Sequence, residues 1–176
     1  MDQQLLFLIN RTWTHPVTDR VMAVASSIDF WLPFLVLGGI VALIWGGFRW
    51  RVFLLAVALA VGITDGLVVD ALKKVVERPR PNDSLAGVRS VDLDHLKPRS
   101  LARGKPLRVN LSSVGIRPPG GNSFPSGHAS SNFAAAAVCA AVFRRRGWLM
   151  FLPAALVAYS RVYVGAHWPL DVLVSA

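Results

Sequence analysis

Charged residues are scarce in this sequence. Asp, Glu, Lys and Arg make up 16% of its 176 residues and hydrophobic residues 53%, whereas soluble domains average about 25% charged residues. The mean hydropathy is +0.47. The length suits one domain rather than two. We therefore expect a single membrane domain over residues 1–176 and not an ordinary soluble protein.

Cysteine and acidic residues are few, and no signal peptide is recognisable. Cys139 is the only cysteine, so no intrachain disulfide can form, and no Cys/His group has zinc spacing. The net charge of +9 could indicate nucleic acid or an anionic membrane as partner, but no nucleic-acid-binding motif is present. Asp2 and the short apolar run 5–9 do not fit a signal peptide. No carboxylate cluster suggests a catalytic metal, so we expect no metal, no cofactor and no nucleic acid.

Apolar segments of membrane-spanning length are present. A bilayer needs about 20 apolar residues per helix, which predicts spans at 28–48, 52–76, 126–143 and 148–164. A last helix is expected to begin within 167–176 and to be cut short. Residues 1–25 are too polar to span and predict an amphipathic helix at the membrane interface.

The second span contains charged residues that are costly in lipid. Asp70 and Lys73 are three positions apart, so they share a helix face and are expected to form an ion pair that positions Lys73. Asp65 lies deeper and receives no predicted role. Lys74 and Arg78 are expected to be charges at the membrane interface.

Residues 77–124 are rich in Pro, Gly, Ser and Arg and predict an extramembrane loop with at most short local structure. Basic residues at 49–51 and 144–146 mark two short turns as cytoplasmic by the positive-inside rule, which places the loop outside. Its charges suit a solvated loop, or a lid in which Arg99, Arg103 and Lys105 recruit anionic headgroups. The predicted fold is an all-α polytopic membrane helix bundle with a long external loop and a truncated last helix.

Alternating spans bring distant polar residues to the outer face of the membrane. They are Lys73, Arg80, Ser126, Gly127, His128, Arg161, His167 and Asp171. Arginine binds phosphate with a planar fork and lysine with a point charge. A helix beginning at Ser126-Gly127 would offer backbone N–H groups to an anion. The cluster therefore predicts a phosphate site built from Lys73, Arg80, Ser126, Gly127 and Arg161.

Two histidines could perform chemistry at this phosphate. His167 and Asp171 are four residues apart, so they would be neighbours on a helix. A carboxylate beside an imidazole fixes its tautomer, which predicts His167 as nucleophile and Asp171 as its orienting residue. His128 is then the predicted general acid.

Three segments carry a resemblance to a known family. They are Lys73 followed after six residues by Arg80-Pro81, then Pro125-Ser126-Gly127-His128, and Ser160-Arg161 followed after five residues by His167 and after three more by Asp171. Together they resemble the signature of the type 2 phosphatidic acid phosphatase superfamily. The resemblance implies a metal-free phosphohistidine mechanism at the bacterial cytoplasmic membrane, with the site facing the periplasm or exterior. The short bacterial members include undecaprenyl pyrophosphate, phosphatidylglycerophosphate and lipid A phosphatases.

The predicted activity is hydrolysis of a lipid phosphomonoester or lipid pyrophosphate. A lipid phosphotransferase could use the same phosphohistidine. A vanadium haloperoxidase shares the motifs, but those relatives are soluble, which the predicted spans oppose. A non-catalytic lipid-binding protein would not need His128, His167 and Asp171 together. The sequence leaves the particular lipid and the oligomeric state open.

Overall fold

The computed structural model describes residues 1–93, 107–113 and 122–176. Its amino-terminal region contains two helices where the sequence analysis expected one over 1–25. Helix α1 (Asp2–Phe7) continues into a π-helical turn, η1 (Leu8–Thr12), and α2 (Pro16–Ser26) follows. The break occurs because Pro16 begins α2 and the His15 side chain caps it by accepting from the Val17 N–H.

Two long apolar helices follow. Helix α3 (Ile28–Trp45) is capped by Ser27. Helix α4 (Phe48–Ile63), the π-helical turn η2 (Thr64–Val69) and α5 (Asp70–Val76) form one continuous helix of 29 residues. In the described part of the chain, these two helices are the ones that are long and apolar enough to be candidate membrane spans. They correspond to the predicted spans 28–48 and 52–76.

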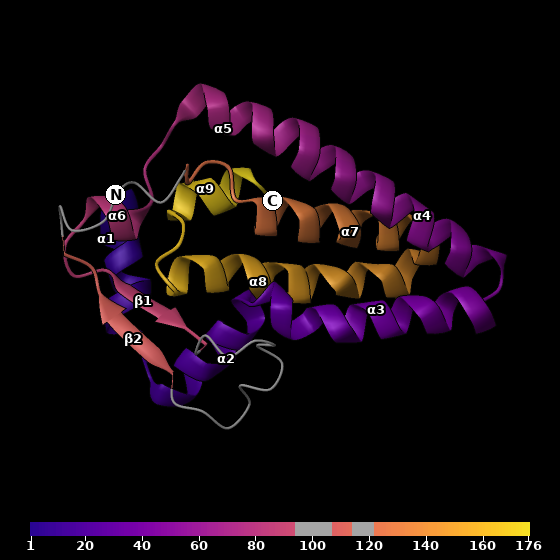
Figure 1. The fold of residues 1–176 in the computed structure, drawn as a ribbon, viewed down its shortest axis with the longest axis horizontal. Helices are drawn as coiled ribbons and strands as arrows, with labels where there is room; N and C mark the ends of the chain where they lie inside the picture. Colours follow the sequence, from indigo (N-terminus) through magenta and orange to yellow (C-terminus); the bar gives the residue numbers. More distant parts are fainter. Residues whose placement is uncertain (94–106, 114–121) are drawn as a thin grey trace.

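Helix α7 (Gly127–Phe143) agrees with the predicted span 126–143 to within one residue. It packs against α4 on one side and α8 on the other, as Figure 1 shows. The predicted span 148–164 is shorter as an α-helix: a 3-10 helix, η4 (Arg144–Met150), precedes α8 (Phe151–Tyr163). Gly147 lets this turn fold back onto α7, because a Cβ there would lie 2.1 Å from the Cys139 carbonyl oxygen.

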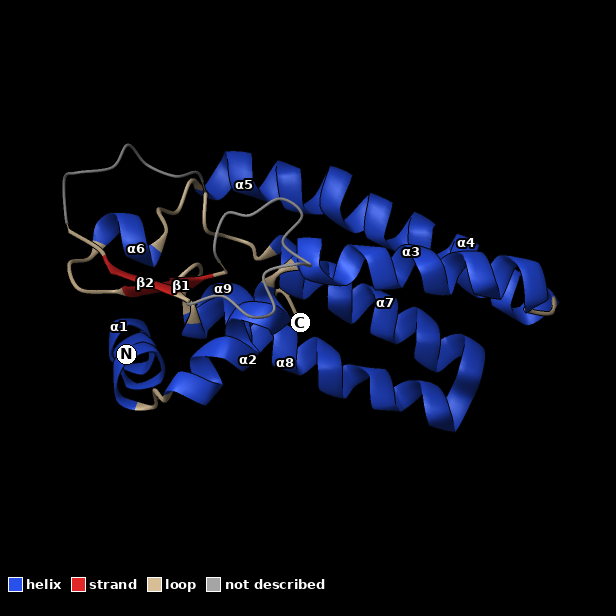
Figure 2. Ribbon diagram, turned by 60° about the horizontal axis from the view of Figure 1, so that its bottom comes forward, coloured by secondary structure: helices blue, strands red, loops and turns tan. Residues whose placement is uncertain are grey.

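The predicted loop 77–124 contains short local structure, as expected, but part of it is β-structure. Helix α6 (Pro81–Ser84) is followed by strand β1 (Arg89–Asp92), which pairs antiparallel with β2 (Arg108–Leu111) and sets Arg89 opposite Leu111. The chain is therefore mostly helical, as predicted, but not all-α (Figure 2). The hairpin is held to the amino-terminal region because the buried Asn10 side chain bonds to both the N–H and the carbonyl of Arg89. The residues of the lid hypothesis, Arg99, Arg103 and Lys105, lie outside the described residues.

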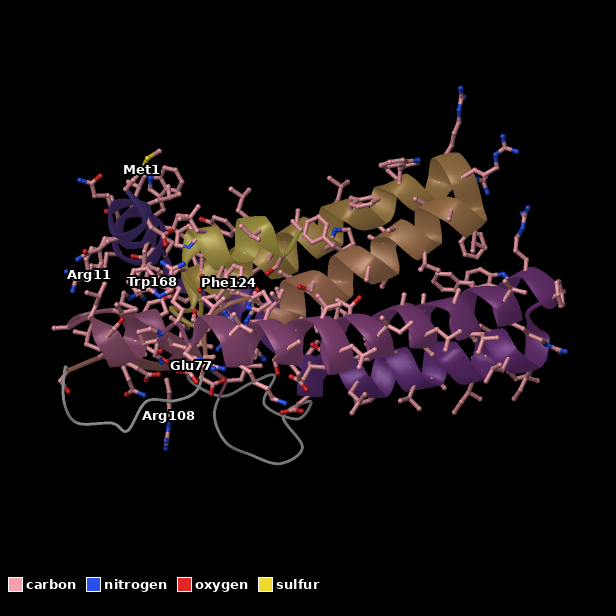
Figure 3. All side chains as sticks on the ribbon, turned by 90° about the horizontal axis from the view of Figure 1, so that it is seen from above. Met1, Arg11, Glu77, Arg108, Phe124 and Trp168 are labelled. Atoms are coloured by element: carbon pink, nitrogen blue, oxygen red, sulfur yellow. The ribbon has the colours of Figure 1, made fainter. Side chains whose placement is uncertain are left out.

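The polar elements gather at one end of the long helices. Helix α9 (Pro169–Val174) lies there with α1, α6 and the hairpin, while the α3–α4 and α7–α8 turns lie at the opposite end (Figure 1). Phe124 and Trp168 mark the polar end in Figure 3, and side chains ending in nitrogen project beyond the other end. This separation is the one that the alternating spans predicted.

Candidate active site

The predicted site residues come from five parts of the fold at this polar end. Lys73 is in the last turn of α5, and Arg80 directly precedes α6. Ser126 caps α7, and Gly127 and His128 are its first two residues. Arg161 is in the last turn of α8. His167 lies in the connection to α9, and Asp171 lies in that helix.

His167 is held in one orientation by a backbone carbonyl. Its Nδ1 lies 2.7 Å from the carbonyl oxygen of Ser123, and the side chain is 4% exposed. A carbonyl can only accept, so Nδ1 carries the proton and Nε2 keeps its lone pair. Burial, together with the positive charges of Arg161 and Arg80, lowers the pKa of His167 to about 3. The ring is therefore neutral near pH 7, which is the state that a nucleophile requires.

The sequence spacing predicted that His167 and Asp171 share a helix. The structure shows that they do not. Helix α9 begins at Pro169, and Asp171 is in its first turn, where its carboxylate accepts the Trp168 N–H at 3.1 Å. The carboxylate also accepts the Ser123 hydroxyl in a short hydrogen bond. Asp171 is fully buried. Its connection to His167 in the described structure therefore runs through Ser123.

Arg78 belongs to this network, although the sequence suggested an interface charge. Its guanidinium lies 2.5 Å from Asp171 and 2.5 Å from Asp2, and it stacks over the Trp168 ring at 4.9 Å. Sequence reasoning missed both Arg78 and Ser123, because their partners are tens of residues away along the chain. The one local signal is that Arg78 lies two residues before Arg80.

Arg80 and Arg161 present buried donors that lack a partner. In the described part of the chain, the Nε atom of each has no hydrogen bond. Arg161 is anchored through Nη1 on the carbonyl and hydroxyl of Ser26. Buried guanidinium nitrogens without partners are rare in folded proteins, and they are the atoms that a phosphate oxygen would satisfy.

His128 lies within the electrostatic influence of three cations. Arg161, Arg80 and Lys73 each act on it, and the charges of Arg161 and Arg80 also reach His167. Lys73 lies near the end of α5. Its backbone carbonyl accepts a hydrogen bond from the Asn122 side-chain amide at 2.6 Å. The described residues contain no ion pair between Asp70 and Lys73, so the predicted pair is wrong. The structure thus gathers two histidines and three cations around one region.

The start of α7 is arranged differently from a simple phosphate cradle. The buried Ser126 accepts the Ala129 N–H at 3.5 Å, and its own N–H donates to the Ser175 hydroxyl at 2.9 Å. Ser126 therefore caps the helix. The N–H groups of Gly127 and His128 lie beyond the helix's own hydrogen bonds. A side chain larger than that of Gly127 would crowd Asp65, because a Cβ here would lie 2.7 Å from Asp65 Oδ1.

An apolar cavity adjoins the charged cluster. It has a volume of about 330 Å³ and extends between α3, α7 and α8. His128 and Asn132 line it together with apolar side chains that include Ile28, Trp31, Leu35, Leu156 and Val157. A hydrocarbon chain placed there would end beside His128. The described residues contain no group of three or more His, Cys, Asp or Glu side chains that could hold a metal ion.

Comparisons with known proteins agree with this arrangement. A family model described as the PAP2 superfamily matches residues 50–176. A lipid A 4'-phosphatase from Bacteroides thetaiotaomicron is 28% identical, over 100% of this chain and 71% of that protein. The crystal structure of LpxE from Aquifex aeolicus is 26% identical with a TM-score of 0.61, over 99% of this chain and 87% of that one. A PAP2-type phosphatidylglycerolphosphate phosphatase from Bacillus subtilis shares the fold, with a TM-score of 0.58 at 21% identity, over 99% and 76% of the two chains.

Proposed function

Because the chain belongs to the PAP2 superfamily, we propose that it is an integral membrane phosphatase that hydrolyses a lipid phosphomonoester or lipid pyrophosphate through a phosphohistidine at His167. The observation that carries this proposal is the hydrogen bond from His167 Nδ1 to the Ser123 carbonyl. It leaves Nε2 unprotonated next to His128 and the unpartnered donors of Arg80 and Arg161.

The proposed reaction has two steps. His167 Nε2 forms a bond to phosphorus while the bond from phosphorus to the lipid oxygen breaks, and His128 gives its proton to that oxygen. Water then attacks the phosphohistidine, His128 takes a proton from the water, and the N–P bond breaks to release phosphate. Lys73, Arg80 and Arg161 neutralise charge on the phosphoryl oxygens, which is most of what phosphoryl transfer demands. The N–H groups of Gly127 and His128 would add two donors, while Ser126 holds the helix start.

The proposed membrane arrangement has four crossings, followed by the short helix α9. Helix α3 and the continuous helix Phe48–Val76 have the length to cross. Helix α7, with 17 residues, is about 26 Å long, close to the hydrocarbon thickness of about 30 Å. Helix α8 would cross with η4. Arg49, Arg51 and the three arginines 144–146 lie at the turns opposite the site, which by the positive-inside rule supports a site at the periplasmic or outer face of a bacterial cytoplasmic membrane.

A lipid substrate, rather than a soluble phosphate, is supported by the cavity beside His128. Its apolar wall would receive a hydrocarbon chain and leave the headgroup phosphate among the cations. The relatives named above act on lipid A and on phosphatidylglycerolphosphate. These names suggest anionic lipid phosphates as the first substrates to assay, with undecaprenyl pyrophosphate and phosphatidic acid beside them.

The test is phosphate release by the chain in lipid nanodiscs, with EDTA present, from lipid A, phosphatidylglycerophosphate, phosphatidic acid and undecaprenyl pyrophosphate. Wild-type protein should release phosphate from at least one lipid, and His167→Gln should release none while eluting as a folded protein. Rapid quenching with labelled substrate should trap a base-stable, acid-labile phosphoprotein that His167→Gln lacks. Full activity of His167→Gln would refute the mechanism. Chromatography of the lipid products would identify a phosphotransferase by a second phosphorylated lipid.

A further inference from the structure

Ser123 lies where three parts of the active-site end meet. It is fully buried and directly precedes Phe124, before the Pro125–His128 segment. Its N–H donates to the Arg78 carbonyl at 2.6 Å, its hydroxyl donates to Asp171, and its carbonyl accepts from His167 Nδ1. Every polar group of Ser123 is therefore engaged, and its hydroxyl also lies 3.5 Å from His167 Nδ1.

These bonds connect Asp171 to His167, to which it makes no hydrogen bond in the described residues. In the described part of the structure, the donors to the Asp171 carboxylate are Arg78, Ser123 and the Trp168 N–H. His167 is not among them. The direction of the Ser123 carbonyl determines where the imidazole ring points, and the hydroxyl bond to Asp171 fixes the position of Ser123. A carboxylate that is fully buried strengthens such a bond, because the surroundings have a low dielectric constant.

Arg78 also helps to hold Ser123 and Asp171 in position. Its backbone carbonyl holds the Ser123 N–H, and its guanidinium neutralises Asp171. The same guanidinium is paired with Asp2, which also accepts the Leu170 N–H at 3.0 Å. Helix α1, far away in sequence, thereby fixes both Arg78 and the start of α9.

We infer that Ser123 and Arg78 are positioning residues for the nucleophile: they transmit the orienting effect of Asp171 to His167 and keep its Nε2 aimed at phosphorus. The inference rests on the proposed function, since it presumes that His167 attacks. It assigns Asp171 an indirect role, in place of a direct contact with the histidine. Loss of this positioning should lower kcat and leave KM unchanged. A misdirected imidazole ring of His167 would attack phosphorus more slowly, while the cations would still bind the phosphate.

Ser123→Ala tests this role, because alanine keeps the carbonyl and removes only the hydroxyl. Misplacement of a reacting group by about 1 Å can reduce the rate about 100-fold, so we expect kcat to fall by about 10- to 100-fold. KM for the lipid should stay close to the wild-type value. The rate of phosphohistidine formation in a single turnover should fall by the same factor as kcat. Affinity for orthovanadate, which mimics the transition state at Nε2, should fall in parallel, whereas inhibition by inorganic phosphate should not change.

Ser112→Ala is the matched control. The Ser112 hydroxyl is also hydrogen-bonded, accepting the Val88 N–H at 2.9 Å and donating to the Leu85 carbonyl at 2.6 Å, but it lies outside the network around His167. This variant should keep wild-type kcat and vanadate affinity. Combining Ser123→Ala with Asp171→Asn should reduce kcat by less than the product of the two single effects, because both act on one path.

Two results would overturn the inference. One is a folded Ser123→Ala variant with wild-type kcat and vanadate affinity. The other is fully multiplicative loss in the double variant. If Ser123→Ala does not fold, Arg78→Lys decides the matter, because lysine keeps the charge but cannot bridge Asp2 and Asp171 as a fork; unchanged kcat there would count against the inference. Failure of the proposed function is a separate outcome, seen as wild-type activity that persists in His167→Gln.

Discussion

Replacing Gly127 by alanine should lower the activity of the site by crowding Asp65. An alanine Cβ at this position would lie 2.7 Å from Asp65 Oδ1, whereas ordinary contact begins at 3.4 Å. The carboxylate or the start of α7 must therefore move by at least 0.7 Å, the difference between the two distances. A shift of the start of α7 would move His128, the next residue in that helix, whereas a shift of the carboxylate would disturb the packing between η2 and α7.

The expected magnitude follows from the cost of overpacking. Extra methyl groups in a packed site cost about 1–3 kcal/mol, and each 1.36 kcal/mol of barrier corresponds to about tenfold in rate. If the cost is expressed in the transition state, kcat/KM should fall by about 5- to 160-fold. The contacts made by the Cβ other than with the Asp65 carboxylate are ordinary, since the closest one is Val69 Cγ1 at 3.7 Å.

A double variant isolates this contact. Asp65→Ala removes the carboxylate and leaves room for the new methyl group, so Gly127→Ala with Asp65→Ala should regain most of the activity that Gly127→Ala loses. The assay is kcat/KM for phosphate release in nanodiscs, measured for the wild type, both single variants and the double variant. Gly62→Ala is the control, because a Cβ there would have no heavy atom within 4 Å. Wild-type activity in Gly127→Ala, or a double variant no better than Gly127→Ala, would refute the reasoning.

Three further predictions concern the cations, pH and the apolar cavity. Arg161→Lys should reduce kcat/KM by about 100-fold or more, because loss of one preorganised transition-state donor typically costs that much; retention of activity would show that only the charge matters. The lowered pKa of His167 means that the unfolded chain binds more protons between about pH 3 and 6.5, so stability rises with pH in this window and is lost as the pH falls. Between pH 7 and 5, wild type should therefore lose about 2 kcal/mol more of its unfolding free energy than His167→Gln, measured by denaturant titration in micelles, and equal losses would contradict the assignment. Leu156→Gln should raise KM for a long-chain lipid phosphate but not for a water-soluble phosphate ester, and a parallel change for both would place the hydrocarbon chain elsewhere.

The convergence of the site could be predicted from the sequence because it depends only on the alternation of long helices. Lys73 ends one helix, His128 begins another, and Arg161 ends the third, so up-and-down packing places them at one end whatever the side-chain details. The family resemblance is confirmed by the match to residues 50–176. The hairpin of β1 and β2 was missed because each strand has only four residues, and their pairing depends on contacts with distant Asn10 and with each other.

The start of the last helix was a different kind of error, because the signal was in the sequence. Trp168-Pro169 fits a helix that begins at proline, since proline favours the first helical position and disfavours α conformation in the residue before it. Counting four residues from His167 to Asp171 ignored this boundary. The Asp70–Lys73 pair failed for a related reason: helix spacing makes a contact between two side chains available but does not require that they form it.

Arg78, Ser123 and Asp2 could not be found by spacing, and the reason is the way in which a membrane site must be built. A buried carboxylate such as Asp171 is costly unless charges and donors surround it, and the short helix α9 cannot supply them. Besides the Trp168 N–H, they come from Arg78 before α6 and from Ser123, while Asp2 in the first turn of the chain holds Arg78. No local sequence pattern reveals this requirement, because the local backbone structure around Arg78, Ser123 and Asp2 does not depend on it. The need is visible only once Asp171 is known to be fully buried, so burial and not spacing identifies the residues that hold the nucleophile in place.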